Sequence, residues 1–324
     1  MKVFEKPRIV ISKCLGQAKC RYDGAVIHSD LVEGLAPFVD YITVCPEMGI
    51  GLPVPREALR IVRNEQGEDC LVFSMSGTDK TQAMLDFAKT FLGGLDENEI
   101  DGFILKHRSP SCGMNDVKIY RGIGKSPMIP GKTTGLFGRK VEELFPMIPV
   151  ENEGRLLNFN LREHFMMRVF LMRDFKKAKA SGKLSELIRF HSTNKYLFMA
   201  FSQKHLSSMG KVVANHEKDD LQTLIKKYEE YLIKATSQPL SIQRNINVLL
   251  HIFGYFKKHL NSAEKAFFLE KMELYNKKRI PFSVMLGILN SWVIRFDEPY
   301  LKGQTIFEPF PVSLFEVTDS GKGL

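Results

Sequence analysis

The first half of the chain alternates short apolar runs with segments of helical periodicity. Short runs of apolar and β-branched residues predict strands, and apolar positions three and four residues apart predict helices. The predicted strands cover residues 9–12, 41–44, 71–75 and 102–105, and the predicted helices cover 31–38, 80–91 and 139–145. This alternation is typical of an α/β domain with a mostly parallel sheet, which we place at residues 1–155.

The predicted helix at residues 80–91 has start and stop signals as well as an apolar face. Met84 and Ala88 lie on that face. We expect Thr78 to cap the start of this helix and Gly93 to end it.

After residue 158 the strand-like runs give way to long helical patterns. Helices are predicted over residues 160–180, 184–213, 217–235, 241–259, 262–277 and 282–296, with joints at Pro239, Asn261 and Pro281. Successive helices without strands favour an all-α helical bundle domain, which we place at residues 159–318. We expect the last residues, 319–324, to be disordered.

Neither half contains a membrane-spanning pattern or an export signal. The longest uncharged run, residues 280–294, has 15 residues and includes Pro281 and Asn290, so it is shorter than the roughly 20 apolar residues that a spanning helix needs. The first residues lack the charged region and apolar stretch of a signal peptide. We therefore expect a cytoplasmic protein with no membrane partner.

The net charge of +9 belongs to the second half of the chain. Residues 1–158 contain 20 Lys and Arg against 21 Asp and Glu, whereas residues 159–324 contain 26 against 16. A basic helical domain favours a polyanionic partner, although basic helix faces that serve solubility alone have the same composition. No helix-turn-helix or zinc-finger pattern supports DNA reading.

Three of the five cysteines follow predicted strands and lie in turn-like segments. Cys14, Cys45 and Cys112 come after the first, second and last of these strands. If the strands are parallel neighbours, the three thiols meet at the carboxyl edge of the sheet, where open α/β sheets place their active sites. An odd number of cysteines without an export signal argues against disulfides and for metal binding or catalysis.

Three soft thiolates without a fourth ligand favour an iron–sulfur cluster, or a zinc ion, with one open coordination position. The cysteine spacing matches no zinc-finger signature, and spacing alone does not decide between the two. Cys20 and Cys70 remain, and we expect them to be free thiols rather than ligands.

The residues around these cysteines resemble the thiouracil desulfidase (TudS) family over roughly the first half of the chain. The resemblance is carried by the three cysteine segments, by Arg21-Tyr22-Asp23-Gly24, and by the stretch from Cys45-Pro46-Glu47 to Pro55-Arg56. Residues 189–196, RFHSTNKY, resemble the YbgA-like helical domain. The combination is similar to the RudS-type desulfidases, which convert 4-thiouridine in tRNA to uridine.

The resemblance implies a [4Fe-4S] cluster held by Cys14, Cys45 and Cys112. It implies that the thiocarbonyl sulfur binds the open iron, that water attacks the carbon, and that sulfide is released in a hydrolytic, non-redox reaction. The implied partner is tRNA or a thionucleotide substrate. No protein partner is implied, and the oligomeric state is not predicted.

Glu47, Ser109 and Ser111 are the candidate catalytic residues. Glu47 lies two residues beyond Cys45, so in an extended segment it faces the same cavity, where a carboxylate can deprotonate water. The alternative is a carboxylate that stabilises a helix start after Pro46. The resemblance implies a serine in the turn before the third cysteine; we favour Ser109, although either hydroxyl can simply form the turn.

Asp23, Arg56, Lys106 and Arg108 are candidates for substrate binding. The three cationic side chains can contact a nucleotide phosphate, and Asp23 can orient the base. Structural ion pairs and solvated charges are the alternative interpretation.

The helical domain carries candidate RNA-binding residues at Arg189, His191, Lys195 and Lys204. Their spacing places them on nearby faces of one predicted helix, where a basic stripe can follow an RNA backbone. The aromatic residues among them recur at helical spacing and are predicted to lie in the core. They are Phe190, Tyr196, Phe198 and Phe201.

Two alternatives to a tRNA desulfidase stay open. A desulfidase of free thiouracil or thionucleotides would use the same site, with the helical domain serving stability or oligomerisation. A non-catalytic RNA-binding protein with a structural metal site is the other alternative. Cys20 as a permanent fourth ligand would favour it, because no position would then remain for a substrate atom.

Overall fold

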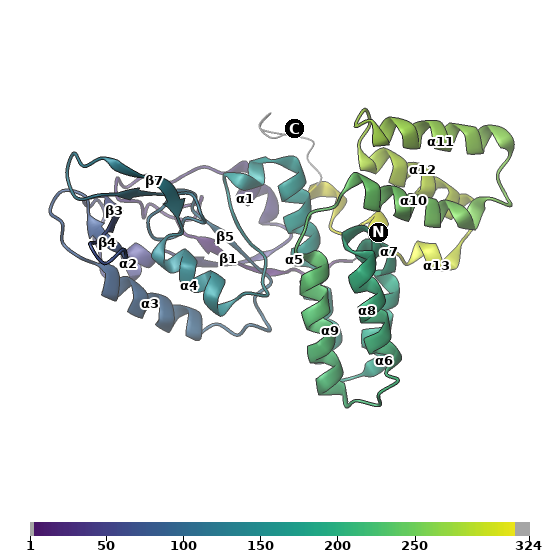
Figure 1. The fold of residues 1–324 in the computed structure, drawn as a ribbon, viewed down its shortest axis with the longest axis horizontal. Helices are drawn as coiled ribbons and strands as arrows, with labels where there is room; N and C mark the ends of the chain where they lie inside the picture. The colour runs from purple at the N-terminus through teal and green to yellow at the C-terminus, as the bar shows by residue number, and fades with distance from the viewer. Residues whose placement is uncertain (1–2, 315–324) are drawn as a thin grey trace. The chain divides into compact units, whose positions relative to one another are not determined.

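The computed structural model describes residues 3–314, which form two compact units (Figure 1). One unit covers residues 4–173, and the other covers residues 174–312 together with Val3. The first contains all the strands of the described chain, and the second is helical. An α/β domain followed by an all-α domain is therefore confirmed.

A parallel sheet lies at the centre of the first unit. Its strands are β1 (Arg8–Ser12), β2 (Asp40–Val44), β5 (Gly102–Leu105) and β8 (Val150–Asn152), in the order β2-β1-β5-β8. Every neighbouring pair is parallel. The strands predicted before Cys14, Cys45 and Cys112 are thus adjacent and parallel, as the sequence required for the three thiols to meet.

A second, mixed sheet was not predicted. It contains β3 (Leu59–Arg63), β4 (Asp69–Phe73), β6 (Val117–Tyr120) and β7 (Met128–Thr133), in the order β4-β3-β6-β7. The predicted strand at 71–75 corresponds to β4, but β4 pairs antiparallel with β3 and lies outside the parallel sheet. The hairpin turn is closed by Asn64, whose amide donates to the carbonyl of Glu68 at 2.9 Å.

The helices of the first unit are short apart from α3. They are α1 (Asp30–Leu35), α2 (Pro46–Gly49), α3 (Thr81–Gly93) and α4 (Leu136–Leu144). The prediction that Thr78 caps α3 is wrong: Lys80 is the N-cap, and the Asp79 carboxylate accepts the amide of Thr81 at 2.6 Å. Gly94 forms the C-cap, so the predicted end is confirmed.

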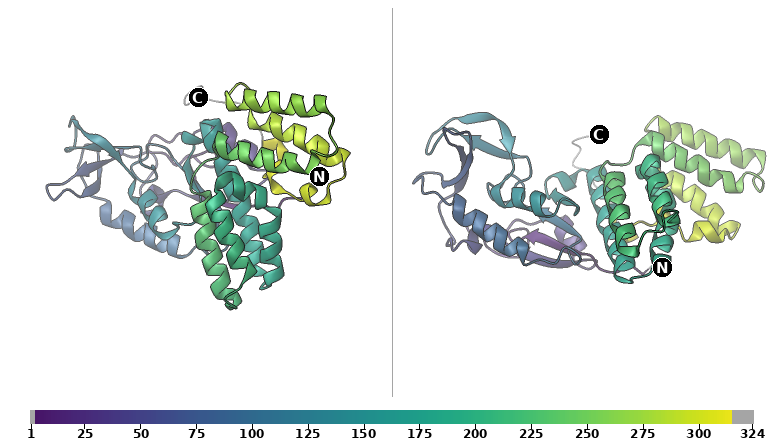
Figure 2. Two further views of the ribbon diagram at one scale, coloured as in Figure 1. Left: turned by 45° about the vertical axis from the view of Figure 1, so that its right-hand side comes forward. Right: turned by 60° about the horizontal axis from the view of Figure 1, so that its bottom comes forward.

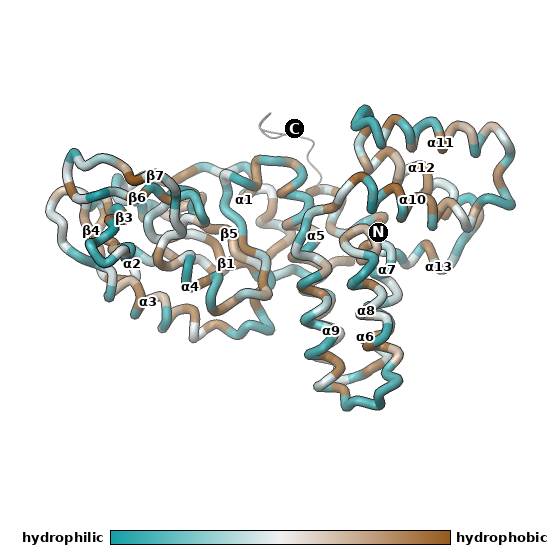
Figure 3. The backbone as a smooth tube through the Cα atoms, viewed as in Figure 1, coloured by the Kyte–Doolittle hydropathy of each residue, from teal (hydrophilic) through white to brown (hydrophobic). Residues whose placement is uncertain are grey.

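One hydrophobic core joins the two sheets to α3 and α4. Val10 and Phe103 come from the parallel sheet, Ile61 from the mixed sheet, Met84 from α3 and Phe137 from α4. The hydropathy colouring of Figure 3 shows hydrophobic and hydrophilic positions mixed along α3 and α4, while β1 and β5 are apolar runs with four buried residues each. This core holds the strand ends and the start of α4 in fixed relation, which matters for the site below.

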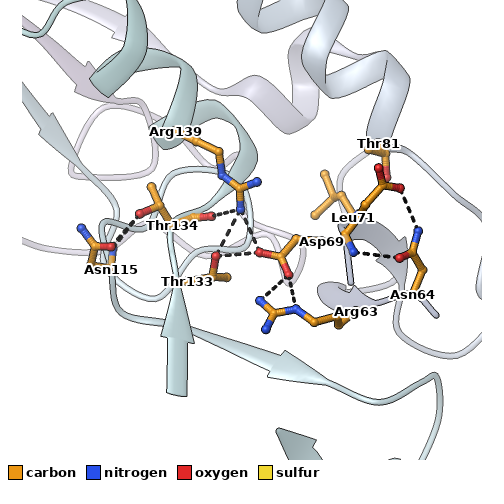
Figure 4. A network of polar contacts seen from close by, with 10 residues as sticks. Arg63, Asn64, Asp69, Leu71, Thr81, Asn115, Thr133, Thr134 and Arg139 are labelled. Atoms are coloured by element: carbon orange, nitrogen blue, oxygen red, sulfur yellow. Dashed lines mark hydrogen bonds and ion pairs between the residues drawn. The ribbon is translucent and has the colours of Figure 1, made fainter. Parts of the chain in front are cut away.

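A buried carboxylate fastens β4 to β7 and α4 (Figure 4). The side chain of Asp69 is 6% exposed and accepts hydrogen bonds from Arg63 at 2.7 Å, Thr133 at 2.7 Å and Arg139 at 2.9 Å. Burial alone would raise the pKa of Asp69, but the bonds from Thr133, Arg63 and Arg139 hold it below its ordinary value. The ionised carboxylate therefore stabilises this corner of the unit.

The second unit is built from successive helices (Figure 2). The long helices of the described chain here are α9 (Leu221–Thr236), α10 (Ile242–Phe256), α11 (Ser262–Asn276) and α12 (Phe282–Arg295). Shorter elements are α6 (Leu184–Thr193), α7 (Lys195–Phe201), α8 (Gln203–Ala214), α13 (Pro299–Lys302) and the 3₁₀ turn at Thr305–Phe307, and a further 3₁₀ turn, Val312–Leu314, begins at the last residue of this unit. The break between the units falls after Arg173, within α5 (Phe159–Ala180), and the 3₁₀ turn at Arg155–Leu157 precedes it in the first unit.

The single helix predicted over residues 184–213 is wrong, because the chain breaks at two polar residues. Asn194 ends α6, and its side chain donates to the carbonyl of Phe190. Ser202 is extended, and its hydroxyl accepts the amide of His205 at the start of α8. Asn and Ser side chains offer the backbone such alternatives to helical bonds. The predicted joints at Pro239, Asn261 and Pro281 are confirmed.

Among residues 3–314, no helix is both long and apolar enough to cross a membrane. The predicted disorder at 319–324 lies outside the described residues.

Candidate active site

A cavity of about 320 Å³ opens at the carboxyl ends of β1, β2 and β5. Cys14, Cys45 and Cys112 line it, and Cys20 lines it as well. The remaining lining side chains are mostly charged or hydroxylic. They include Ser12, Lys13, Arg21, Tyr22, Glu47, Arg56, Lys106, His107, Arg108 and Ser109.

Cys20 is closely associated with two of the predicted ligands. Its thiol interacts with the thiols of both Cys14 and Cys45, and the Cys45 thiol donates to the Cys20 carbonyl at 3.8 Å. The interaction with Cys14, together with burial, raises the pKa of Cys20 to about 11. The pKa of Cys45 is raised well above its ordinary value by its interaction with Cys20 and by burial. Cys20 is a buried thiol outside any disulfide, at 1% exposure, and its burial is inside the candidate site.

The loop that carries Cys112 is fixed by the start of α4. The amides of Phe137 and Gly138 donate to the carbonyl of Ser111, and the amide of Gly135 donates to that of Gly113. Free amides at a helix start need such acceptors. The contact is so close that a Cβ on Gly135 would lie 2.5 Å from the Ser111 carbonyl oxygen.

Ser12 is a site residue that sequence reasoning missed. It ends β1, is 2% exposed, and its hydroxyl accepts the amide of Lys106 at 2.9 Å. It also interacts with the Cys112 thiol, and this interaction partly offsets burial, which raises the pKa of Cys112. The hydroxyl therefore ties the ends of β1 and β5 to the third cysteine.

Glu47 is held from two sides. One carboxylate oxygen accepts from Arg56 at 2.6 and 3.0 Å, and the other accepts from the Ser111 hydroxyl at 3.0 Å. The expectation of an extended segment here is wrong, because Pro46–Gly49 forms the one-turn helix α2 with Glu47 in its first turn. Glu47 therefore lies at a helix start, as the alternative interpretation stated, and its side chain still lines the cavity.

The two candidate serines differ in position. The Ser109 hydroxyl accepts the amides of Ser111 at 3.2 Å and Cys112 at 3.1 Å, which forms the turn, and it also interacts with the Cys112 thiol. Ser109 lines the cavity. Ser111 is fully buried and donates to Glu47.

The three cationic candidates, Arg56, Lys106 and Arg108, all line the cavity, and two of them also form ion pairs. Arg56 has a 2% exposed side chain, and besides Glu47 it donates to the carbonyls of Cys20 and Pro53. Lys106 pairs with Glu153, while Arg108 adopts a positive φ of 57°. The structural ion-pair alternative therefore describes Arg56 and Lys106 in this conformation.

Asp23 lies outside the cavity lining. Its carboxylate accepts from Arg21 at 2.9 and 3.0 Å and from the amide of Ala25. The bond from Arg21 lowers the pKa of Asp23 to about 2. Asp23 thereby fixes Arg21, which lines the cavity together with Tyr22; both belong to the stretch that carries the family resemblance but were not predicted as site residues.

The donor set fits a soft cofactor. Four thiols line one cavity, and clustered buried thiols become stable thiolates only beside cations. Thiolates are the ligands of iron–sulfur clusters, so these side chains fit a cluster held at this edge of the sheet.

The four candidate RNA-binding residues lie on three helices of the second unit. Arg189 and His191 are on α6, Lys195 begins α7, and Lys204 is on α8. Burial, with the nearby charge of Lys195, lowers the pKa of His191 to about 4, and its Nδ1 lies 3.1 Å from the Tyr228 hydroxyl.

The aromatic residues predicted for the core are at most 5% exposed, which confirms that prediction. They are Phe190, Tyr196, Phe198 and Phe201.

Comparison with known proteins identifies both parts of the chain. Residues 9–153 match the family model of 2-thiouracil desulfurase, and residues 195–311 match a protein family of unknown function, DUF1722. YbbK of Bacillus subtilis, an uncharacterized protein, is 34% identical over 128 residues, or 38% of this chain and 83% of YbbK. YbgA of Escherichia coli K12, also uncharacterized, is 26% identical over 148 residues, or 45% of this chain and 88% of YbgA.

A solved structure is also similar. It is a [4Fe-4S]-dependent thiouracil desulfidase, TudS, with 30% identity over 47% of this chain and 93% of that chain, and a TM-score of 0.37. With the YbbK match and the family model covering the four-thiol cavity, the chain belongs to the 2-thiouracil desulfurase family and carries a YbgA-like DUF1722 domain after it.

Proposed function

We propose that the protein hydrolyses the thiocarbonyl group of 4-thiouridine in tRNA, giving uridine and sulfide, with a [4Fe-4S] cluster held by Cys14, Cys45 and Cys112. The observation that carries the proposal is the convergence of these thiols with Glu47 and Ser109 in one cavity. The reaction is balanced without electrons: water supplies the oxygen and two protons, and the sulfur leaves as hydrogen sulfide.

Glu47 is the general base of the proposal. Arg56 and Ser111 fix its carboxylate from both sides, yet one oxygen bonded only to Ser111 retains a lone pair for a water proton. A positioned base of this kind contributes about 100-fold or more to rate. The proton that Glu47 takes from water returns to the departing sulfur or to the ring nitrogen.

Ser109 orients the substrate. Its oxygen accepts two amides and its hydroxyl interacts with the Cys112 thiol, and in the proposed reaction the hydroxyl proton turns from that sulfur to the developing carbonyl oxygen. When bound, the cluster would supply a Lewis-acidic iron with affinity for the soft thiocarbonyl sulfur.

Cationic side chains at the cavity suit a nucleotide. Lys13, Arg21 and Arg108 line it outside the Glu47 pair, with Arg21 held by Asp23, and they offer contacts for phosphate groups.

The second unit contributes the basic surface of the proposal. Arg189 lines a polar cavity of about 670 Å³ with Lys177 and Lys302. This surface, with His191, Lys195 and Lys204, is proposed to bind the RNA backbone.

The test is anaerobic reconstitution of the full chain, with iron and acid-labile sulfide analysis, followed by incubation with tRNA containing 4-thiouridine. We expect about four irons per chain and loss of the thiocarbonyl absorbance, both abolished by Cys112→Ala. Cys70→Ala is the matched control, because Cys70 lies on β4 outside the cavity. Stoichiometric zinc, or a full cluster with unchanged tRNA, contradicts the proposal.

Desulfidation of free thiouracil is a second candidate. It is favoured by the family model, whose match ends at residue 153 and thus requires only the first unit. Turnover of 4-thiouracil at a rate equal to or above that of thiolated tRNA would support it over the tRNA reaction.

A further inference from the structure

Cys20 is the one thiol of the cavity that the proposed function leaves unused. It is 1% exposed and lines the same cavity as the three proposed ligands. Its thiol interacts with both Cys14 and Cys45. A structural thiol in an apolar core has no such partners, so its placement needs another explanation.

The backbone of Cys20 is fixed on every side. Its amide donates to the carbonyl of Ala18 at 2.9 Å. Its carbonyl accepts from Arg56 at 2.9 Å and from the Cys45 thiol at 3.8 Å. Arg56 is the same side chain that holds Glu47, so the position of the Cys20 thiol is coupled to that of the proposed base.

We propose that Cys20 is the displaceable fourth ligand of the cofactor. Without substrate, its sulfur occupies the position that the three other cysteines leave open, and the thiocarbonyl sulfur of the substrate replaces it. This inference rests on the proposed function for the identity of the displacing atom. The exchange breaks one iron–sulfur bond and forms another; Cys20 takes up a proton from water as it leaves, the hydroxide formed passes to the solvent, and no electron is transferred.

The physical advantage of such a ligand is retention of the fourth iron. An iron that lacks a protein ligand is exposed to water and oxidants in a cavity open to solvent, and it is the first to be lost. A thiol already present in the wall prevents this loss. The bond between the Cys20 sulfur and the iron can also be exchanged, because the thiocarbonyl sulfur of the substrate is a soft ligand of comparable affinity.

Iron retention tests the proposal without any substrate. Reconstituted wild type, Cys20→Ala, Cys20→Ser and the control Cys70→Ala are treated anaerobically with ferricyanide, and the EPR signal of a three-iron cluster is followed. We expect both Cys20 variants to lose one iron about ten-fold faster than wild type, the scale on which lost metal contacts act, and Cys70→Ala to behave as wild type. Equal rates in all four proteins overturn the proposal.

Substrate affinity provides a second readout: we expect Cys20→Ala to increase it while it decreases iron retention. In a Glu47→Gln background, which slows turnover about 100-fold or more, 4-thiouracil binding is measured with and without Cys20→Ala before substrate is consumed. Because the competing ligand is gone, we expect 4-thiouracil to bind more tightly to the Cys20→Ala protein, while its cluster is less stable. A purely structural role for Cys20 predicts that both properties weaken together, which would overturn the proposal.

The two proposals fail separately. A wild-type cluster that is protected by Cys20 but leaves thiolated tRNA and 4-thiouracil unchanged would contradict the proposed function and support the ligand role. Full desulfidase activity with equal iron retention in Cys20→Ala would do the reverse.

Discussion

The carboxylate of Glu47 shows how single side chains prepare this cavity for chemistry. It lies one residue into a helix that begins at Pro46, immediately after a cysteine at a strand end. Arg56 and Ser111 bind its two oxygens, so its rotamer is fixed before any substrate arrives. Preorganised groups of this kind lower a barrier because they do not reorganise during the reaction.

Replacing Glu47 by Gln tests its role with little change of shape. We expect kcat for desulfidation to fall about 100-fold or more, because the amide cannot accept a proton from water. Iron content should be unchanged, since Glu47 is not a proposed ligand. Glu68→Gln is the control, because Glu68 is exposed and bonds only within the β3–β4 turn. Activity within two-fold of wild type in both variants would contradict a base role.

The three predicted cysteines could be located from the sequence because each follows an apolar strand, and strands that alternate with helices favour a parallel sheet. Parallel pairing of β1 with β2 and β5 then brings their carboxyl ends together. Cys20 and Ser12 could not be located in this way. Cys20 reaches the cavity through a turn stabilised by Arg56, a contact 36 residues distant in the chain that no local pattern contains.

At the scale of elements, α4 acts as the support of the Cys112 loop. Gly135 and Gly138 let the helix start approach the loop carbonyls closely: a Cβ on Gly138 would lie 2.9 Å from the Gly113 carbonyl oxygen. A side chain at either position would displace the loop, the helix or both. The glycines therefore set the place of the third cysteine.

Gly135→Ala should destabilise the first unit and weaken the cofactor site. Its Cβ would lie 2.5 Å from the Ser111 carbonyl oxygen, and overpacking of this kind costs about 1–3 kcal/mol of unfolding free energy. Iron content after reconstitution should fall as well, because Cys112 moves with the loop. Gly93→Ala is the matched control: it lies at the end of α3 with open space around it. Urea unfolding and iron analysis of both variants check the expectation, and equal behaviour would contradict it.

The Asp69 network predicts a pH-dependent contribution to stability. The pKa of this carboxylate is lowered in the folded protein, so its stabilisation is fully present above its ordinary value of 3.8 and is lost as the pH falls through the folded value. We expect Asp69→Asn to lower the unfolding free energy by about 1–3 kcal/mol at pH 7, because three charged or hydroxyl donors lose an ionised acceptor. The difference from wild type should shrink below about pH 4. A constant difference from pH 7 to pH 3 in urea unfolding would show that charge is not the cause.

Helices were easier to predict than the mixed sheet. The boundaries of α5, α11 and α12 follow apolar periodicity and proline or asparagine at their starts. By contrast, β3 contains Arg60 and Arg63 among its five residues, and β7 contains Pro130 and Gly131, so neither resembles a strand locally. Their pairing is decided by the core that they share with the parallel sheet.

At the scale of the whole molecule, chemistry and charge are divided between the two halves of the sequence. The cysteines all lie in the first half, which is nearly neutral, and the excess of Lys and Arg lies in the second. The proposed RNA substrate suits this division, because in that proposal the small cavity recognises the modified base and the separate basic surface binds the backbone.

The basic surface of the helical unit can be tested apart from the cavity. Arg189→Gln and Lys204→Gln each remove one exposed charge, and His191 is neutral at pH 7 because its pKa is about 4. If both side chains contact phosphates, tRNA binding should weaken, and the slope of log affinity against log salt should become shallower by about one unit per contact. Turnover of free 4-thiouracil should be unchanged, since neither residue lines the thiol cavity.

Lys277→Gln is the matched control for this prediction, because Lys277 is an exposed cation at the end of α11 that pairs with Glu273. Lys277→Gln removes one positive charge, as the two test variants do. Its effect on tRNA binding therefore measures the contribution of net charge alone. A salt slope that falls equally in all three variants would assign tRNA binding to overall charge. A slope that falls only for Arg189 and Lys204 assigns it to contacts on α6 and α8, and links the helical domain to the substrate of the first unit.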